Sequence, residues 1–159
     1  MFWEEPSKKQ QIEDMFKRPG LEEKDFKALT GFNSYAAEID FELVQASTLI
    51  FKKYIDEKNY LYDDHVHFQL HILDDNNAMI IVHDSSNTYG ISYIYSSDQF
   101  PAMNITKDSN GGREIFQNQL EMPSDERSFL AGAISRFCYH ILFIAYKTQK
   151  KNEYIPPHF

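Results

Sequence analysis

Three histidines on one side of an extended segment are the residues of this chain best placed to do chemistry. The segment DHVHFQLHILD, residues 64–74, alternates polar and apolar residues, which is the pattern of a half-buried antiparallel strand. His65, His67 and His71 fall on its polar face, and residues two apart on a strand lie about 6–7 Å apart. Two imidazoles at that spacing can share a metal ion. The same pattern is also typical of a solvated strand face, and His-x-His alone does not distinguish the two.

A carboxylate is expected near this histidine face. The run DDNN, residues 74–77, is a turn signal that would join the histidine strand to a second apolar strand. In a simple hairpin register across that turn, His67 faces Asp84, which could orient the ring or act as a ligand. In the same register, His83 falls on the core side of the sheet. The candidate metal ligands are therefore His65, His67, His71 and Asp84.

Other reactive residues do not converge on one site. Cys138 and His140 lie two positions apart on a predicted helix, about 200° around its axis, so this imidazole cannot serve the thiol as a base. The cysteine also falls on the apolar stripe and is expected to be a buried, inert thiol. The acidic pairs at 63–64 and 74–75 lie at opposite ends of one strand, about 30 Å apart. Composition and spacing thus name no reaction, and no cofactor is expected.

The hydrophobic pattern predicts the elements that position these residues. Two long segments carry apolar stripes with helical spacing, and between them several apolar runs are separated by turn signals. This order predicts one α+β domain, residues 1–159, with an antiparallel β-meander of three to four strands packed against long helices. The expected segments are short charged helices at 1–31, a long helix at 34–58, the β-meander at 64–106, a long C-terminal helix at 124–148 and an extended tail at 149–159.

The predicted C-terminal helix has a second apolar side. Tyr139, Phe143 and Tyr146 lie opposite the stripe that faces the core. Either the N-terminal helices cover these aromatic side chains, or they form a surface for a partner or for a homodimer, because exposed aromatic patches mark binding sites.

The charge of the chain limits its partners. The formal net charge is −8, which argues against sequence-independent binding to nucleic acid or to anionic membranes. No run of 18 apolar residues predicts a membrane span, and the start MFWEEPSKKQQ does not have the pattern of a signal peptide, so a cytoplasmic location is expected. A basic protein is the expected partner, and the acidic turn at Asp74 and Asp75 is a candidate contact.

These observations favour a small non-catalytic protein-binding module, either of an inhibitor or immunity type or of an adaptor or chaperone-like type. Two alternatives remain open at this point. One is a small metal- or histidine-dependent enzyme that uses the strand histidines. The other is a homo-oligomeric ligand-binding module that buries Tyr139 and Phe143 between subunits.

Overall fold

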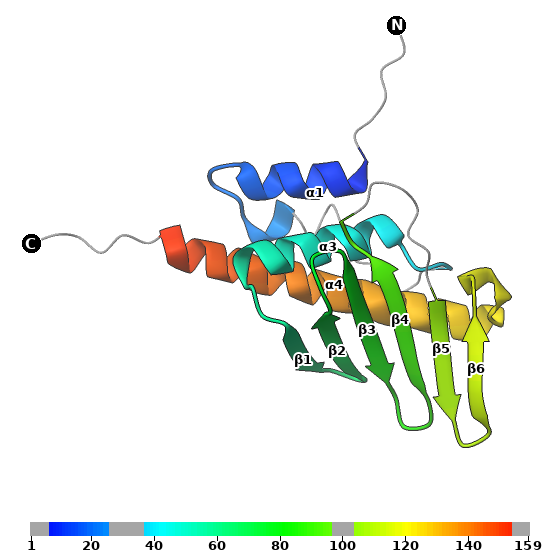
Figure 1. Cartoon of the computed structure of the whole chain (residues 1–159). Helices are drawn as coiled ribbons and strands as arrows, with labels where there is room; N and C mark the ends of the chain where they lie inside the picture. Colours follow the sequence, from blue (N-terminus) through cyan, green and yellow to red (C-terminus); the bar gives the residue numbers. More distant parts are fainter. Residues whose placement is uncertain (1–6, 26–36, 97–103, 154–159) are drawn as a thin grey trace, which may run out of the picture.

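A six-stranded antiparallel sheet with helices on one of its faces makes up most of the structure (Figure 1). The computed structural model describes residues 7–25, 37–96 and 104–153. The elements in chain order are α1 (Lys8–Lys17), α3 (Phe41–Tyr54), β1 (Asn59–Asp63), β2 (His67–Ile72), β3 (Asn77–His83), β4 (Thr88–Ile94), β5 (Asn104–Ser109), β6 (Gly112–Phe116), the 3-10 turn η1 (Gln119–Glu121) and α4 (Ser124–Glu153). The predicted α+β class is confirmed, but the meander has six strands rather than three or four.

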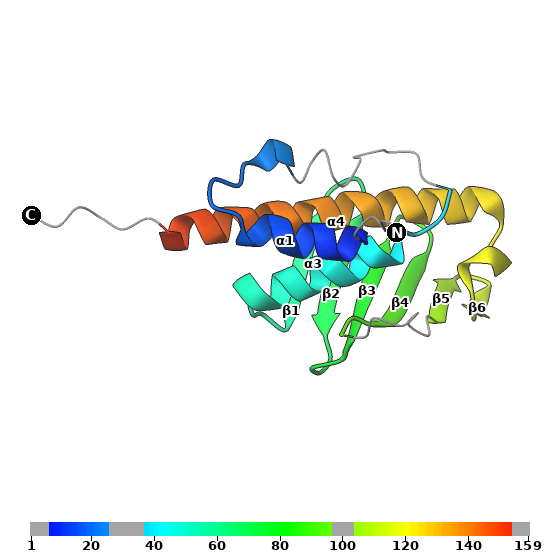
Figure 2. The same ribbon diagram turned by 90° about the horizontal axis from the view of Figure 1, so that it is seen from above.

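The sheet follows the chain without a crossover. Its order is β1-β2-β3-β4-β5-β6, so β1 and β6 are its two edges. Helices α3 and α4 cover one face, and α1 packs on their outer side, which gives three layers (Figures 1 and 2). Alternate residues of the central strands β3 and β4 enter the core, and their neighbours lie on an open face turned away from the helices.

The two strands missing from the sequence prediction are the edge strands. The predicted long helix was expected to continue to residue 58, whereas α3 ends at Tyr54 and β1 begins five residues later. The pattern from Thr106 to Gln119 predicts a loop, but this stretch contains the last four residues of β5 and all of β6. These two strands pair Ser109 with Gly112 across Asn110-Gly111, a dipeptide that favours a two-residue hairpin turn.

Helix α3 starts later than predicted and is buried on two sides. Asp40 caps it by accepting a hydrogen bond from the Leu43 backbone N–H at 3.1 Å. The predicted start of this helix at residue 34, the last part of the segment 1–31 and the tail after residue 153 lie outside the described residues. Helix α3 lies between α1 and the sheet (Figure 1), which accounts for its burial on two sides.

Helix α4 is the central element of the core. It continues to Glu153, so the first part of the predicted extended tail is helical. Its stretch Ser124–Lys151 is long and apolar enough to cross a membrane, but 56% of the most apolar window is buried, as in the core helix of a soluble protein. The Phe137 ring lies parallel to the Phe68 ring of β2, with their centroids 4.8 Å apart, and this stack joins the helix to the middle of the sheet.

Candidate functional site

The pairing of β2 with β3 differs by one residue from the predicted register. Ile72 lies opposite Ala78, so His67 faces His83 rather than Asp84. His83 is therefore on the open face, and the prediction that it points to the core is wrong. The difference arises in the turn. The Leu73 backbone N–H donates to the Asn77 carbonyl, so the loop between the strands has three residues, 74–76, and not the four of the predicted turn.

The structure does not bring the four candidate metal ligands together. His65 lies in the turn before β2, where the chain is not extended. Asp84 lies in the next turn, and its carboxylate accepts the backbone N–H groups of Ser86 and Asn87, both at 2.7 Å. His71 is four positions along β2 from His67.

His71 has its own partners on the open face. Its Nδ1 lies 2.5 Å from Asn59 Oδ1, and its Nε2 lies 2.9 Å from Gln69 Oε1. Within the described ranges, no group of three or more His, Cys, Asp or Glu side chains could hold a metal ion.

The acidic turn between β2 and β3 has a structural role. The Asp74 carboxylate accepts the backbone N–H groups of Asn76 and Asn77 at 2.7 Å, and these hydrogen bonds hold its pKa below the usual range. Asp75 is fully exposed and pairs with Lys52 at 2.7 Å. Both acidic side chains are exposed, but the Asp74 carboxylate is engaged by the backbone of the turn and the Asp75 carboxylate by Lys52.

The aromatic patch of α4 is half-buried. The Tyr139 hydroxyl donates to Glu23 Oε1 at 2.9 Å, so the N-terminal segment covers part of the patch. Phe143 and Tyr146 lie beside lysine ammonium groups of the same helix, at 4.6 and 5.8 Å from the ring centroids.

A hollow of about 310 Å³ lies where this patch meets β1. Its lining residues are Tyr62, Asp64, Arg136, Tyr139, His140 and Phe143. They come from the first edge strand, from the turn that follows it and from about two turns of α4. The sequence predicted Tyr139 and Phe143 as contacts but not the other four, because only the fold brings residues 62–64 next to residues 136–143.

His140, one of the residues that line this hollow, contacts two tyrosines of β1. Its ring stacks on Tyr62 with centroids 3.6 Å apart, and its Nε2 lies 2.6 Å from the Tyr60 hydroxyl. Burial lowers the pKa of His140, and the negative charge of Asp64 opposes this effect only in part. The neutral ring is thereby favoured, and it can accept the hydrogen bond from Tyr60.

The lowered pKa of His140 predicts how stability depends on pH. In the unfolded chain this imidazole takes up a proton near its ordinary pKa of 6.5, whereas the folded chain resists protonation until lower pH. The contribution of the neutral His140 ring to the free energy of unfolding is therefore complete above pH 6.5. It is lost as the pH falls from 6.5 toward the lower pKa of His140 in the folded chain. Urea unfolding at about pH 7.5 and about pH 5 should show a larger loss of stability for the wild type than for His140→Phe, which retains a ring against Tyr62. Equal losses in the two proteins would contradict this assignment.

Arg136 places a hydrogen-bond donor in the wall of the hollow. Its Nε is buried and has no hydrogen-bond partner in the described part of the chain. The nearest carboxylate oxygen, Asp64 Oδ2, lies 3.9 Å away, which is too far for a hydrogen bond. A buried donor without a partner costs about 1–3 kcal/mol, so this side chain is held in the wall of the hollow at the expense of stability.

The outer edge of β1 presents backbone groups that the sheet does not use. Ile72 N–H donates to Lys58 C=O at 2.7 Å, and Asp64 N–H donates to Val66 C=O at 3.0 Å. Because an antiparallel ladder alternates, residues 58, 60, 62 and 64 direct their backbone groups toward β2. Asn59, Leu61 and Asp63 therefore direct theirs outward, where no strand of the described sheet pairs with them.

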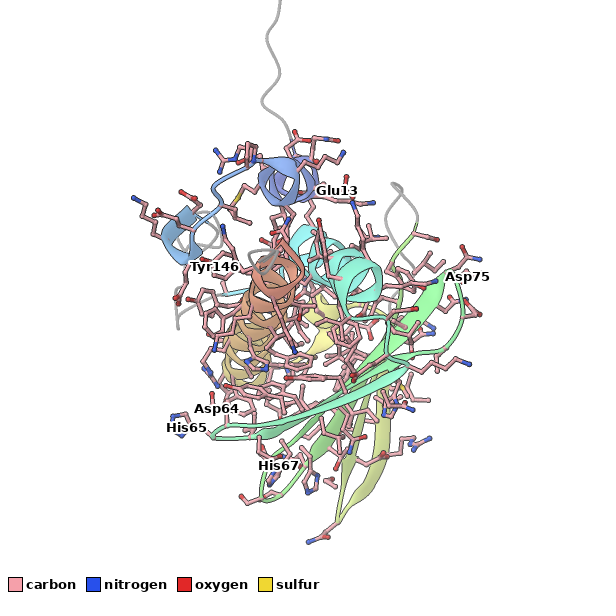
Figure 3. All side chains as sticks on the ribbon, turned by 90° about the vertical axis from the view of Figure 1, so that its left-hand side faces the viewer. Glu13, Asp64, His65, His67, Asp75 and Tyr146 are labelled. Carbon is pink, nitrogen blue, oxygen red and sulfur yellow. The ribbon has the colours of Figure 1, made fainter. Side chains whose placement is uncertain are left out.

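Acidic residues stand at both ends of this edge. Asp56 and Glu57 precede β1, with Lys58 beside them, and Asp63 and Asp64 end it. Figure 3 looks onto this side of the molecule and shows Asp64 and His65 at the tip of the strand. The formal charge is −1 at the first end and −2 at the second.

Comparison of the chain with protein-family models, with curated proteins and with solved structures found no match. Cys138 is buried, and this burial raises the pKa of its thiol to about 12. The thiol therefore stays protonated and is a poor nucleophile. The arrangement offers an open strand edge beside a hollow with aromatic walls, which Arg136 and Asp64 also line.

Proposed function

We propose that this protein is a non-catalytic binding module that takes up an extended, basic segment of a partner protein along the outer edge of β1. The observation that supports this most strongly is the position of the hollow directly beside unpaired strand groups. An extended segment can add to an exposed sheet edge, where backbone hydrogen bonds supply affinity and pockets for alternate side chains supply specificity. Inhibitors and adaptors both use contacts of this kind.

The hollow is suited to a side chain of the added segment. Tyr62 is on the helix face of β1, so a residue opposite it on the new strand would also point toward α4. There it would meet the rings of Tyr139 and Phe143, with the Asp64 carboxylate at the rim. A lysine or arginine could lay its aliphatic stem on the rings and direct its charge to Asp64, in competition with Arg136, whose Nε lies 3.9 Å from that carboxylate.

The charges at the two ends of β1 favour a basic segment over a second copy of the chain. An antiparallel pairing of β1 with its own copy would place the net-negative start of one strand against the net-negative end of the other. Like charges in such a position oppose association, whereas lysines and arginines on a partner would be attracted to both ends. The net charge of −8 adds a long-range attraction in the same direction.

Selection from a library of displayed random peptides of about 15 residues tests this function. Peptides enriched on the immobilised full-length chain should carry a surplus of lysine and arginine, and their affinity should fall as salt is raised, because screening weakens the attraction. The selection uses a matched control, Phe143→Ser, which removes one aromatic wall of the hollow. Enrichment of acidic or purely apolar peptides, or equal recovery on the control, would argue against this site. Self-association of the wild type that competes with peptide would favour a homodimer instead.

A further inference from the structure

Two histidines face each other on the open side of the sheet, away from the β1 hollow. His67 of β2 and His83 of β3 are directly opposed cross-strand partners, and their ring centroids lie 6.2 Å apart. Both are exposed, and Figure 3 shows His67 projecting from the face of the sheet turned away from the helices. The sheet fixes the spacing of their backbones, so little order has to be created for both rings to hold one ligand.

The hydrogen bonds of the two rings leave the same nitrogen available on each. His67 Nδ1 lies 2.5 Å from Asp63 Oδ1, and an ionised carboxylate only accepts, so Nδ1 carries the hydrogen. His83 Nδ1 lies 2.5 Å from the Thr88 hydroxyl, which can accept in the same way. The Nε2 atoms make no hydrogen bond to the described part of the chain.

This is the arrangement that metal-binding histidines adopt. Such a histidine donates its second ring N–H to a carboxylate or another oxygen, which orients the ring and strengthens the bond to the metal. Asp63 has this position for His67, and Thr88 has it for His83. Asp63 lies directly opposite His67 on β1, and Thr88 lies directly opposite His83 on β4. The register of the sheet therefore sets both hydrogen bonds that orient the rings, which we call the outer contacts of the site.

The separation of the rings is close to that required for one shared ion. With Zn–N distances of about 2.0–2.1 Å and a tetrahedral angle, two bound imidazoles have their centroids about 5 Å apart. The two rings must therefore approach by about 1 Å, which rotation of exposed side chains allows. Imidazole nitrogen suits zinc, copper and nickel rather than magnesium or calcium.

We propose that His67 and His83 form a two-histidine binding site for a late first-row divalent metal ion, with solvent in the remaining coordination positions. The two rings lie on the open face and not in the β1 hollow, and the site does not depend on the proposed protein-binding function, although Asp63 also belongs to the acidic end of β1. It differs from the metal set expected from the sequence, since His65, His71 and Asp84 have no part in it.

Calorimetric titration of the untagged full-length chain with Zn²⁺ tests the site. Binding of one ion is expected, weakened at least about tenfold by His67→Ala or His83→Ala and by about 10–100-fold by Asp63→Asn, which alters only the outer contact. His65→Ala and His71→Ala are matched controls and should bind as the wild type does. In the wild type, nuclear magnetic resonance should show Zn²⁺ shifting the ring signals of His67 and His83 together, a result that needs no variant. Absence of saturable binding, or ring shifts confined to other histidines, would overturn the proposal.

Discussion

Replacement of Phe137 by alanine should lower the free energy of unfolding by about 3–5 kcal/mol, the cost expected when a buried phenylalanine leaves a cavity in a core. Phe137 is 1% exposed and stacks on Phe68 of β2. It also lies 6.3 Å from the ring of Tyr62, so its loss would loosen β1 as well as the centre of the sheet. The contacts of this one side chain thus join α4 to two strands, and the surrounding side chains cannot close the gap without moving those strands.

Urea unfolding of matched variants would measure this effect. Phe129→Ala removes the same ring from the same helix, but at a position that is 40% exposed, and it should change stability by about 0.5 kcal/mol or less. If both variants lost the same stability, the stack between α4 and the sheet would not be the principal contact of the core.

The parts of the fold that depend on local patterns could be predicted from the sequence. The alternation within residues 64–74 gave the correct faces for His67 and His71, because a strand alternates regardless of its neighbours. The apolar stripe of α4 gave the buried position of Cys138 in the same way. A helix or a strand that repeats its period over several turns needs no tertiary information to be recognised.

The β2–β3 register could not be obtained from the period alone. A shift of one residue reverses which side chains face the core on the second strand, and it is set by the geometry of the turn. Here the Asp74 carboxylate binds the N–H groups of Asn76 and Asn77 and keeps the loop to three residues. His83 consequently lies on the open face beside His67, where the sequence prediction had placed Asp84.

The candidate site depended on contacts between distant parts of the chain. Tyr60 and His140 are 80 positions apart and meet at 2.6 Å. β1 is only five residues long and carries a weak strand signal directly after a helix, so its edge was not foreseen. The acidic residues at its ends were visible in the sequence, but their relation to a strand edge was not.

Substitution of Leu61 by proline should abolish or strongly weaken peptide binding while leaving the fold intact. The Leu61 N–H points away from β2, so proline removes a donor that the sheet does not use. Its ring also occupies the space of an incoming strand at the centre of β1. The loss of one strand hydrogen bond and the steric conflict together should reduce affinity by about tenfold or more.

A matched variant separates the backbone from the side chain. Leu61 is 68% exposed on the open face, and Leu61→Thr retains the backbone N–H while making the side chain smaller and more polar. The threonine variant should bind within about threefold of the wild type, because a β-branched residue suits a strand and its side chain points away from the hollow. Similar melting temperatures for the two variants would confirm that proline at this edge leaves the fold in place.

The affinity of a selected basic peptide for Leu61→Pro and for Leu61→Thr, measured side by side, is the most direct test of binding at the β1 edge. Addition of a strand predicts that the proline variant binds about tenfold more weakly than the threonine variant, or worse, at equal stability. Equal affinities in the two folded variants would show that the peptide does not pair with β1, and the proposed mode of binding would be wrong.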